Sequence, residues 1–245
     1  MKTKSKKRLS ILFILLLLLN LFTVVIPPTV IAQENSGEYC GDTLLMNYIS
    51  QNFSGRITVT IAALRPVANS RVVINIENHD SGHTFVRLDF GDGNVIARGF
   101  YSYGMTIAQT INNTSIKGEL KDDSTHDWNA AVVYEITLDQ AGRIKDYINS
   151  FDVDDFRVVS SNCTTFAVNA LASAGISPPT QKHKWTLPNR NEIIAALPFY
   201  ILDKSTVANQ FLNKTYYGYS PADAVQDFKS NENCILKYDG VLRKP

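Results

Sequence analysis

The sequence predicts a mixed fold of β-strands and α-helices, because it contains alternating strand patterns, one hairpin signal and two helices with marked ends. The strand segments are rich in β-branched residues and alternate polar with apolar side chains, which is typical of half-buried strands. Gly91-Asp92-Gly93-Asn94 separates two of these segments and favours a tight hairpin between antiparallel strands. The expected strands cover residues 56–64, 71–77, 83–90, 95–101 and 132–136.

The first marked helix begins at a capping box. Thr137 and Gln140 are spaced so that each side chain can bond a backbone N–H of the other residue. The helix is expected to continue to about residue 149 and to bury one apolar stripe, made of Ile144, Tyr147 and Ile148. Shorter helices are expected over 43–51 and 221–228.

The second marked helix should begin at Asn162 or Cys163 and continue to Ala174. Gly175 is placed to cap its last turn, and Pro178-Pro179 cannot continue it, so the end is well defined. At helical spacing one face of this segment carries small and apolar side chains: Cys163, Ala167, Ala170, Leu171 and Ala174.

Residues 1–32 have the layout of a secretory signal. A basic stretch over 2–8 precedes an apolar run over 9–26, and Val30-Ile31-Ala32 provides a cleavage site. We expect cleavage after Ala32 and a location outside the cell or in the cell envelope. The alternative is an uncleaved anchor, although the apolar run is short for a span of about 20 residues.

The chain that would remain after cleavage has more acidic than basic residues. Residues 1–32 hold five basic and no acidic side chains, so 19 basic residues then face 23 acidic ones. We therefore expect no nucleic-acid partner, and membrane contact only through an uncleaved signal. The expected organisation is a catalytic domain over 33–180 and a C-terminal extension over 181–245 that packs on the same domain.

The cysteine count leaves one thiol over. Export favours disulfides, and the chain contains Cys40, Cys163 and Cys234. Because the ends of a compact domain are often close together, we expect a Cys40–Cys234 disulfide between the extension and the domain. Cys163 would then be free.

Cys163 is the candidate nucleophile. In the first turn of a helix, free N–H groups and the helix dipole stabilise a thiolate and lower the pKa of the thiol. A neighbouring imidazole would lower it further, and the same N–H groups could hold an oxyanion. The alternative is a small buried residue without chemistry.

His83 is the candidate base, because it opens a strand and faces away from the apolar row over 84–90. His126, in the polar loop 121–127, is its main rival, whereas His79 and His183 are expected to be ordinary surface or hydrogen-bonded residues. His79 and His83 would lie about 13 Å apart on a strand, too far to share one ion. No metal site is expected.

The third residue of the site stays open. If the hairpin turns on Asp92-Gly93, the register pairs His83 with Ser102 and places Arg98 on the same face. Ser102 is taken as the candidate third member, and Asp89, Asp92 and a backbone carbonyl are the alternatives for orienting the imidazole.

Two short motifs in this order are similar to a known group of enzymes. Gly82-His83-Thr84-Phe85-Val86 followed by Asn162-Cys163-Thr164-Thr165-Phe166 resembles the circularly permuted papain-like hydrolases, relatives of NlpC-type cell-wall peptidases and of the lecithin retinol acyltransferase group. The resemblance covers residues 70–180. It implies an α+β fold in which a helix carrying the nucleophile, Cys163, packs on an antiparallel sheet carrying the base, His83.

The expected function is therefore that of a secreted cysteine hydrolase. It would cleave an amide of a small peptide or cell-wall substrate through an acyl-enzyme on Cys163. The alternatives are a lipid acyltransferase or thioesterase on the same scaffold, and a binding protein in which Cys163 is buried or bonded to Cys40 or Cys234. No nucleotide, haem or flavin fingerprint is present, so no cofactor is expected.

Overall fold

The computed structural model describes residues 41–75, 80–104, 109, 113–186, 215–238 and 241–243. The expected signal over 1–32, Cys40 and His79 lie outside the described residues. Among the helices that are described, none combines the length and the apolar character needed to cross a membrane.

A seven-stranded antiparallel sheet forms the centre of the fold, in the order β4-β3-β2-β1-β5-β8-β9. A separate two-stranded ribbon pairs β6 with β7. The strands of the large sheet are β1 (Thr58–Leu64), β2 (His83–Asp89), β3 (Val95–Ser102), β4 (Gly118–Asp122), β5 (Ala130–Glu135), β8 (Cys234–Tyr238) and β9 (Val241–Arg243). The ribbon consists of β6 (His183–Thr186) and β7 (Thr215–Gly218).

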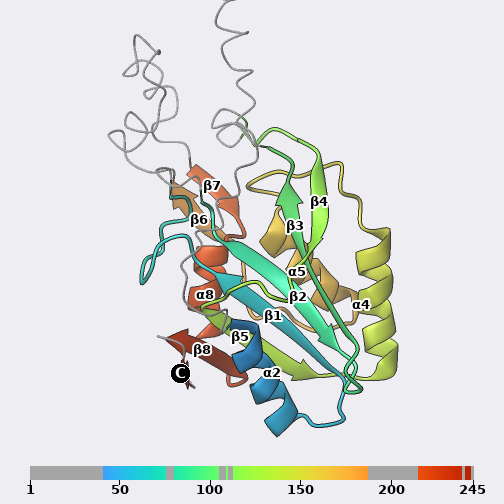
Figure 1. Ribbon diagram of the computed structural model, residues 1–245. Helices are drawn as coiled ribbons and strands as arrows, with labels where there is room; N and C mark the ends of the chain where they lie inside the picture. The colour runs from blue at the N-terminus through green and yellow to red at the C-terminus, as the bar shows by residue number, and fades with distance from the viewer. Residues whose placement is uncertain are drawn as a thin grey trace, which may run out of the picture.

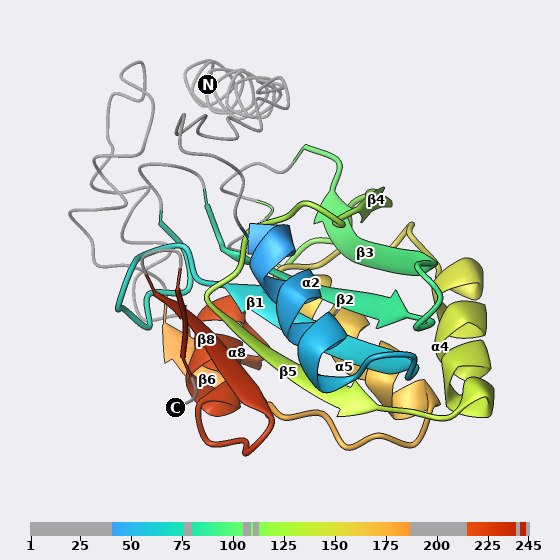
Figure 2. The same ribbon diagram turned by 60° about the horizontal axis from the view of Figure 1, so that its bottom comes forward.

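Helices cover both faces of the large sheet (Figures 1 and 2). Helix α2 (Gly41–Asn52) lies on one face, and α4 (Leu138–Ser150), α5 (Cys163–Ser173) and α8 (Pro221–Phe228) lie on the other. Helix α5 contacts β1, β2 and β3, while α8 contacts β1, β2 and β5. The fold is therefore α+β, with its nucleophile candidate on a helix that packs against the sheet.

Strand β2 is buried on both of its faces. Val86 and Leu88 join the core under α4, α5 and α8. Phe85, on the opposite face, joins a smaller core with Leu45 and Ile49 of α2. Burial of one such side chain stabilises the fold by about 2 kcal/mol, so the first residue of β2 is held firmly in place.

Most of the expected elements are present. Helix α4 has the capping box at Thr137 and Gln140, with both reciprocal bonds formed. Asn162 caps α5, and Gly175 follows the end of that helix with φ +73°. The apolar face expected for the second helix is buried throughout. Residues 215–243 add α8 and also β8, which pairs with β5 in the large sheet.

The strand expected over 71–77 is wrong for its described part. Within 71–75 only Asn75 makes a strand-like pair, a single bridge to Asp80. The Arg71 guanidinium is bound instead to Asp223 near the start of α8. This long-range ion pair holds the segment as a loop, although its alternating pattern favours a strand.

The register expected for the β2–β3 hairpin is also wrong, by one residue. Asp89 pairs with Val95, and the Phe90 N–H bonds the Asn94 carbonyl, which closes a three-residue loop. Gly91 and Gly93 both have positive φ, a conformation that suits glycine. The two-residue turn on Asp92-Gly93 is therefore replaced by a longer one, and every residue of β3 moves to the other face.

Candidate active site

His83 is fixed at the first position of β2. Gly82, immediately before it, has φ +69°, and a Cβ there would lie 2.4 Å from the Leu64 carbonyl oxygen. The Gly82 N–H donates to the Asp80 carboxylate at 2.7 Å. Only glycine fits the backbone conformation and the close contact just before the strand. The imidazole that follows is buried, with 6% of His83 exposed.

Asp123 is the residue that orients His83. It follows β4, and its N–H donates to the Ala97 carbonyl at 3.3 Å. The Asp123 Oδ2 lies 2.8 Å from His83 Nε2, and the Tyr101 hydroxyl donates to Oδ1 at 2.5 Å. The His83 ring also stacks on Tyr101, with centroids 4.2 Å apart. The buried Asp123 carboxylate, the buried His83 imidazole and the half-buried Tyr101 phenol are therefore in direct contact with one another.

The Tyr101 hydroxyl keeps its proton throughout the ordinary pH range. Burial is the main cause that raises the pKa of Tyr101 far above its usual value, and the negative charge of Asp123 raises it further. A protonated phenol donates a hydrogen bond and adds no charge. Asp123 is thus free to carry the negative charge that stabilises a protonated imidazole.

Cys163 opens α5, and Asn162 fixes the start of that helix. The Asn162 side-chain oxygen accepts from the Thr165 N–H at 2.9 Å, which is the usual N-cap bond. Its amide nitrogen donates to Val158 O at 2.6 Å and to Tyr219 O at 2.9 Å. The cap thus joins α5 to the chain before it and to the residues before α8.

Cys163 and His83 lie at the same end of the sheet. The backbone of Thr84, the residue after His83, lies near enough to the Cys163 sulfur to lower the pKa of the thiol. The Thr84 and Thr164 hydroxyls are 2.9 Å apart, which couples β2 to α5 directly. The sulfur is also close enough to Asp123 for the negative charge of that carboxylate to raise the pKa of the thiol.

The thiol does not have the lowered pKa expected from the helix end. Burial raises the pKa of Cys163 to about 11, and the charge of Asp123 acts in the same direction. Hydrogen bonds from Thr84 and Thr164 to the sulfur oppose the shift without cancelling it. The expectation is corrected because desolvation of a thiolate outweighs the helix dipole at this depth.

The imidazole is neutral as well. Burial lowers the pKa of His83, Asp123 opposes that shift, and the nearby charge of His126 adds to it. At neutral pH the site therefore holds a protonated thiol and a neutral imidazole. The Asp123 carboxylate can only accept, so His83 carries its proton on Nε2 and its lone pair on Nδ1.

His126, the rival candidate base, packs against His83. The two ring centroids are 4.7 Å apart, and the His126 ring also lies 5.6 Å from Phe85. His126 Nδ1 is 2.7 Å from the Asp127 carbonyl, to which it must donate. His183 is bound to Asp227 on α8, at 2.9 Å.

The other expected third members do not contact His83 among the described interactions. Ser102 follows Tyr101 and therefore lies on the opposite face of β3. Arg98 forms an ion pair with Asp122 at 3.4 Å. Asp89 ends β2, about 20 Å along the strand from His83. Asp92 caps Asn94 within the hairpin loop.

A polar loop that the sequence marks for its histidine also contains Asp123. The residue lies in the polar loop 121–127 that suggested His126. Strand β4, which positions Asp123, has the sequence GELKD with three charged side chains, a pattern that does not predict a strand.

Neither of the described cysteines is in a disulfide. Cys163 and Cys234 are both free and buried, which argues against a bond between these two residues. Because Cys234 is free, the expected Cys40–Cys234 disulfide is not formed in this structure; Cys40 itself lies outside the described residues. No group of three His, Cys, Asp or Glu side chains within the described part of the chain could hold a metal ion.

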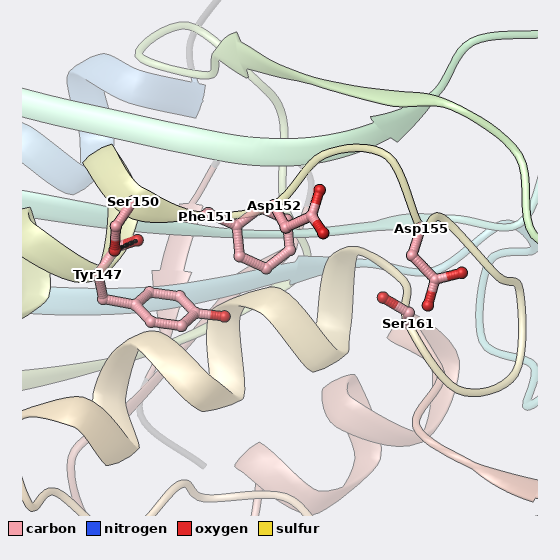
Figure 3. Close-up of a pocket in the computed structure, with 6 residues that line it drawn as sticks. All are labelled: Tyr147, Ser150, Phe151, Asp152, Asp155 and Ser161. Atoms are coloured by element: carbon pink, nitrogen blue, oxygen red, sulfur yellow. Dashed lines mark hydrogen bonds between the residues drawn. The ribbon is translucent and has the colours of Figure 1, made fainter.

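A hollow of about 330 Å³ beside the end of α4 is lined by other residues, among them Tyr147, Asp152 and Asp155 (Figure 3). Asp155 is already bound by Ser115 and by Arg157. The hollow does not include Cys163 or His83, so it takes no part in the candidate chemistry.

Comparison with known proteins adds no relative. No family model matches the sequence, and neither the curated proteins nor the solved structures contain a significant match.

Proposed function

We propose that the protein is a cysteine hydrolase that cleaves an amide bond, with Cys163 as nucleophile, His83 as base and Asp123 as the group that orients His83. The observation that carries the proposal is the buried His83–Asp123 contact of 2.8 Å beside the first residue of α5. A histidine on a sheet, followed along the chain by a cysteine on a helix packed against that sheet, supports a permuted papain-like arrangement.

The first half of the reaction forms an acyl-enzyme. The Cys163 thiol transfers its proton to His83 Nδ1 as the sulfur attacks the carbonyl carbon. Negative charge develops on the carbonyl oxygen, which the N–H groups at the start of α5 can stabilise. The tetrahedral intermediate collapses when the leaving amine takes the proton from Nδ1, and the C–N bond breaks.

The second half releases the acyl group. Water donates a proton to His83 Nδ1 and attacks the thioester carbon. The C–S bond then breaks, and the proton returns to the sulfur, so the products are a carboxylic acid and the free thiol. Asp123 stabilises the imidazolium form in both halves and holds the Nε2 proton in place.

The expected export of the protein indicates the class of substrate. Export by residues 1–32 would place the enzyme outside the cell or in the cell envelope, where a small peptide or a cell-wall peptide is the natural amide. Neither a metal ion nor a cofactor enters the steps above, because the nucleophile and the proton carrier are both side chains.

Hydrolysis of a panel of chromogenic peptide anilides by the chain lacking residues 1–32 tests the proposal. We expect Cys163→Ala and His83→Ala each to lower kcat/KM at least a thousandfold. His126→Ala should retain activity within about tenfold, because Asp123 and not His126 holds the imidazole. Unchanged hydrolysis by Cys163→Ala would refute the proposal, and so would the absence of hydrolysis of every amide by a folded wild-type protein.

A further inference from the structure

Tyr101 contacts both members of the His83–Asp123 pair. Its hydroxyl donates to Asp123 Oδ1 at 2.5 Å, while Asp123 Oδ2 lies 2.8 Å from His83 Nε2. Its ring stacks on the His83 imidazole, with the centroids 4.2 Å apart and the ring planes 27° from parallel. One side chain therefore holds the second oxygen of the carboxylate and also covers the base.

Strand pairing places Tyr101 beside the carboxylate. Gly99 pairs with Phe85 of β2, and Tyr101, two residues further along β3, lies on the same face of the sheet. Tyr101 itself pairs with Glu119 of β4, the strand that leads to Asp123. The sheet thus fixes the backbone at both ends of the hydrogen bond. Rotation of the phenol would leave a buried carboxylate oxygen without this donor, at a cost in free energy.

The phenol changes how strongly the pair binds a proton. Burial lowers the pKa of His83, and the hydrogen bond and negative charge of Asp123 raise it. A hydrogen bond to the other carboxylate oxygen stabilises the negative charge of Asp123 and so weakens its attraction for a protonated imidazole. This donor is present throughout the ordinary pH range, because burial, and then the charge of Asp123, raise the pKa of Tyr101 far above its usual value.

The other titratable and charged groups around Tyr101 and His83 stay in place when the hydroxyl is removed. They are Asp80 before β2, Lys121 on β4 with its partner Glu119, His126 in the loop after β4, and the protonated Cys163 at the start of α5. Tyr101→Phe also keeps the ring that stacks on His83. The substitution therefore isolates the effect of one O–H group.

We propose that Tyr101 is a positioning residue: its hydroxyl, acting through Asp123, keeps His83 unprotonated and able to accept a proton in mildly acidic solution. The inference rests on the proposed function, in which the neutral imidazole is the base. It goes further by naming the group that sets the acid limit of the reaction.

The protonation of His83, measured by NMR, tests the inference without any need for hydrolysis. Imidazole ¹⁵N resonances are followed as the pH is lowered in the Cys163→Ala protein, and His83→Gln identifies the resonance among the four histidines of the chain. Tyr101→Phe should raise the midpoint of His83 protonation by about one pH unit. In the neutral form, the Nε2–H proton should move downfield, because Asp123 becomes a stronger acceptor. If neither the midpoint nor this resonance changes, the inference is overturned.

Tyr103→Phe is the matched control. Tyr103 lies two residues beyond Tyr101 and is 66% exposed, so the loss of its hydroxyl should leave both readings unchanged. An equal change in this variant would overturn the inference, because the effect would then not belong to the Tyr101 hydroxyl.

3-Fluorotyrosine at position 101 is a probe of opposite sign that also serves if Tyr101→Phe fails to fold. Its phenol is more acidic and is therefore a stronger donor, while the side chain keeps its shape. The midpoint of His83 protonation should fall, and the Nε2–H proton should move upfield. Shifts in the other direction, or none, would contradict the action of the phenol through Asp123.

The pH profile of kcat/KM extends the test to the reaction. Its acid limb reports the base of the free enzyme, so Tyr101→Phe should move that limb upward by about one pH unit. Activity should then fall about tenfold on the limb and much less on the plateau. An equal loss at every pH would indicate a structural defect and overturn the inference. If the NMR changes are seen and the folded wild-type protein hydrolyses no amide, the inference stands and the proposed function alone fails.

Discussion

Gly99 lies directly beneath the contact between His83 and Asp123. A Cβ built on Gly99 would be 1.9 Å from the Asp123 Oδ2 atom and 2.2 Å from His83 Nε2. Gly99 pairs with Phe85 across the sheet, so it cannot move without breaking the ladder. The absence of a side chain at this position is a condition for the His83–Asp123 bond.

Gly99→Ala is therefore expected to separate His83 from Asp123. It should lower activity at least a hundredfold and the free energy of unfolding by about 1–3 kcal/mol, because the added methyl overpacks a buried site. Urea unfolding and kcat/KM check the two effects. Gly142→Ala is the control, because a Cβ at position 142 would have no atom within 4 Å. This substitution replaces a glycine inside helix α4 with alanine. It should raise stability by about 1 kcal/mol.

Asp123→Asn should leave the fold intact and lower kcat by about 10²–10⁴-fold. The amide would turn its N–H₂ toward His83 Nε2, move the imidazole proton to Nδ1 and so remove the base. Ser102→Ala is the control, because Ser102 lies on the other face of β3, and it should keep kcat within twofold. Equal losses in both variants would contradict the role given to Asp123. The measurement is kcat with the best anilide.

The reactivity of Cys163 should depend steeply on pH. With its pKa raised to about 11, the rate of alkylation by iodoacetamide should rise about tenfold per unit between pH 7 and pH 10. His83→Ala should abolish hydrolysis and leave that slope unchanged, because the resting pair is neutral. Mass mapping must separate Cys163 from Cys234, whose pKa is also raised to about 11. A rate that is flat above pH 7 would mean that the thiol is already ionised.

The stability of the fold should depend on pH through His83. In the unfolded chain this imidazole titrates near 6.5, and burial lowers its pKa in the folded state. Just below pH 6.5 the imidazole is therefore protonated more in the unfolded chain than in the folded one. The free energy of unfolding then falls as the pH falls, by up to about 1.4 kcal/mol per pH unit. Urea unfolding at pH 7.5, 6.5 and 5.5 measures the slope. His83→Gln should flatten it, and an equally steep slope in that variant would assign the effect elsewhere.

Local signals were enough to predict the elements that carry the nucleophile and the base. The capping box at Thr137, the cap at Asn162 and the strand that begins at His83 depend on neighbours within a few residues, and all three are present. The prediction of a strand over 71–75 was wrong because Arg71 forms an ion pair with Asp223, a residue distant in the sequence. Its alternating pattern carries no information about that ion pair.

The third member of the site could not be predicted for the same kind of reason. Asp123 reaches His83 only because β4 pairs with β3 and because Gly99 leaves room, and both depend on contacts between distant parts of the chain. The pKa of Cys163 likewise depends on burial by β2 and by the end of β3. A helix N-terminus alone could not reveal how deep the thiol lies.

The most direct test of the central claim is to trap the acyl-enzyme. The wild-type chain without residues 1–32 is mixed with an excess of the best anilide, quenched in acid within milliseconds to seconds, and analysed by intact mass and by peptide mapping. We predict one acyl group, held as a thioester on the peptide that contains Cys163, and none in Cys163→Ala. Steady hydrolysis with no acyl group on Cys163, or hydrolysis that survives in Cys163→Ala, would contradict the account.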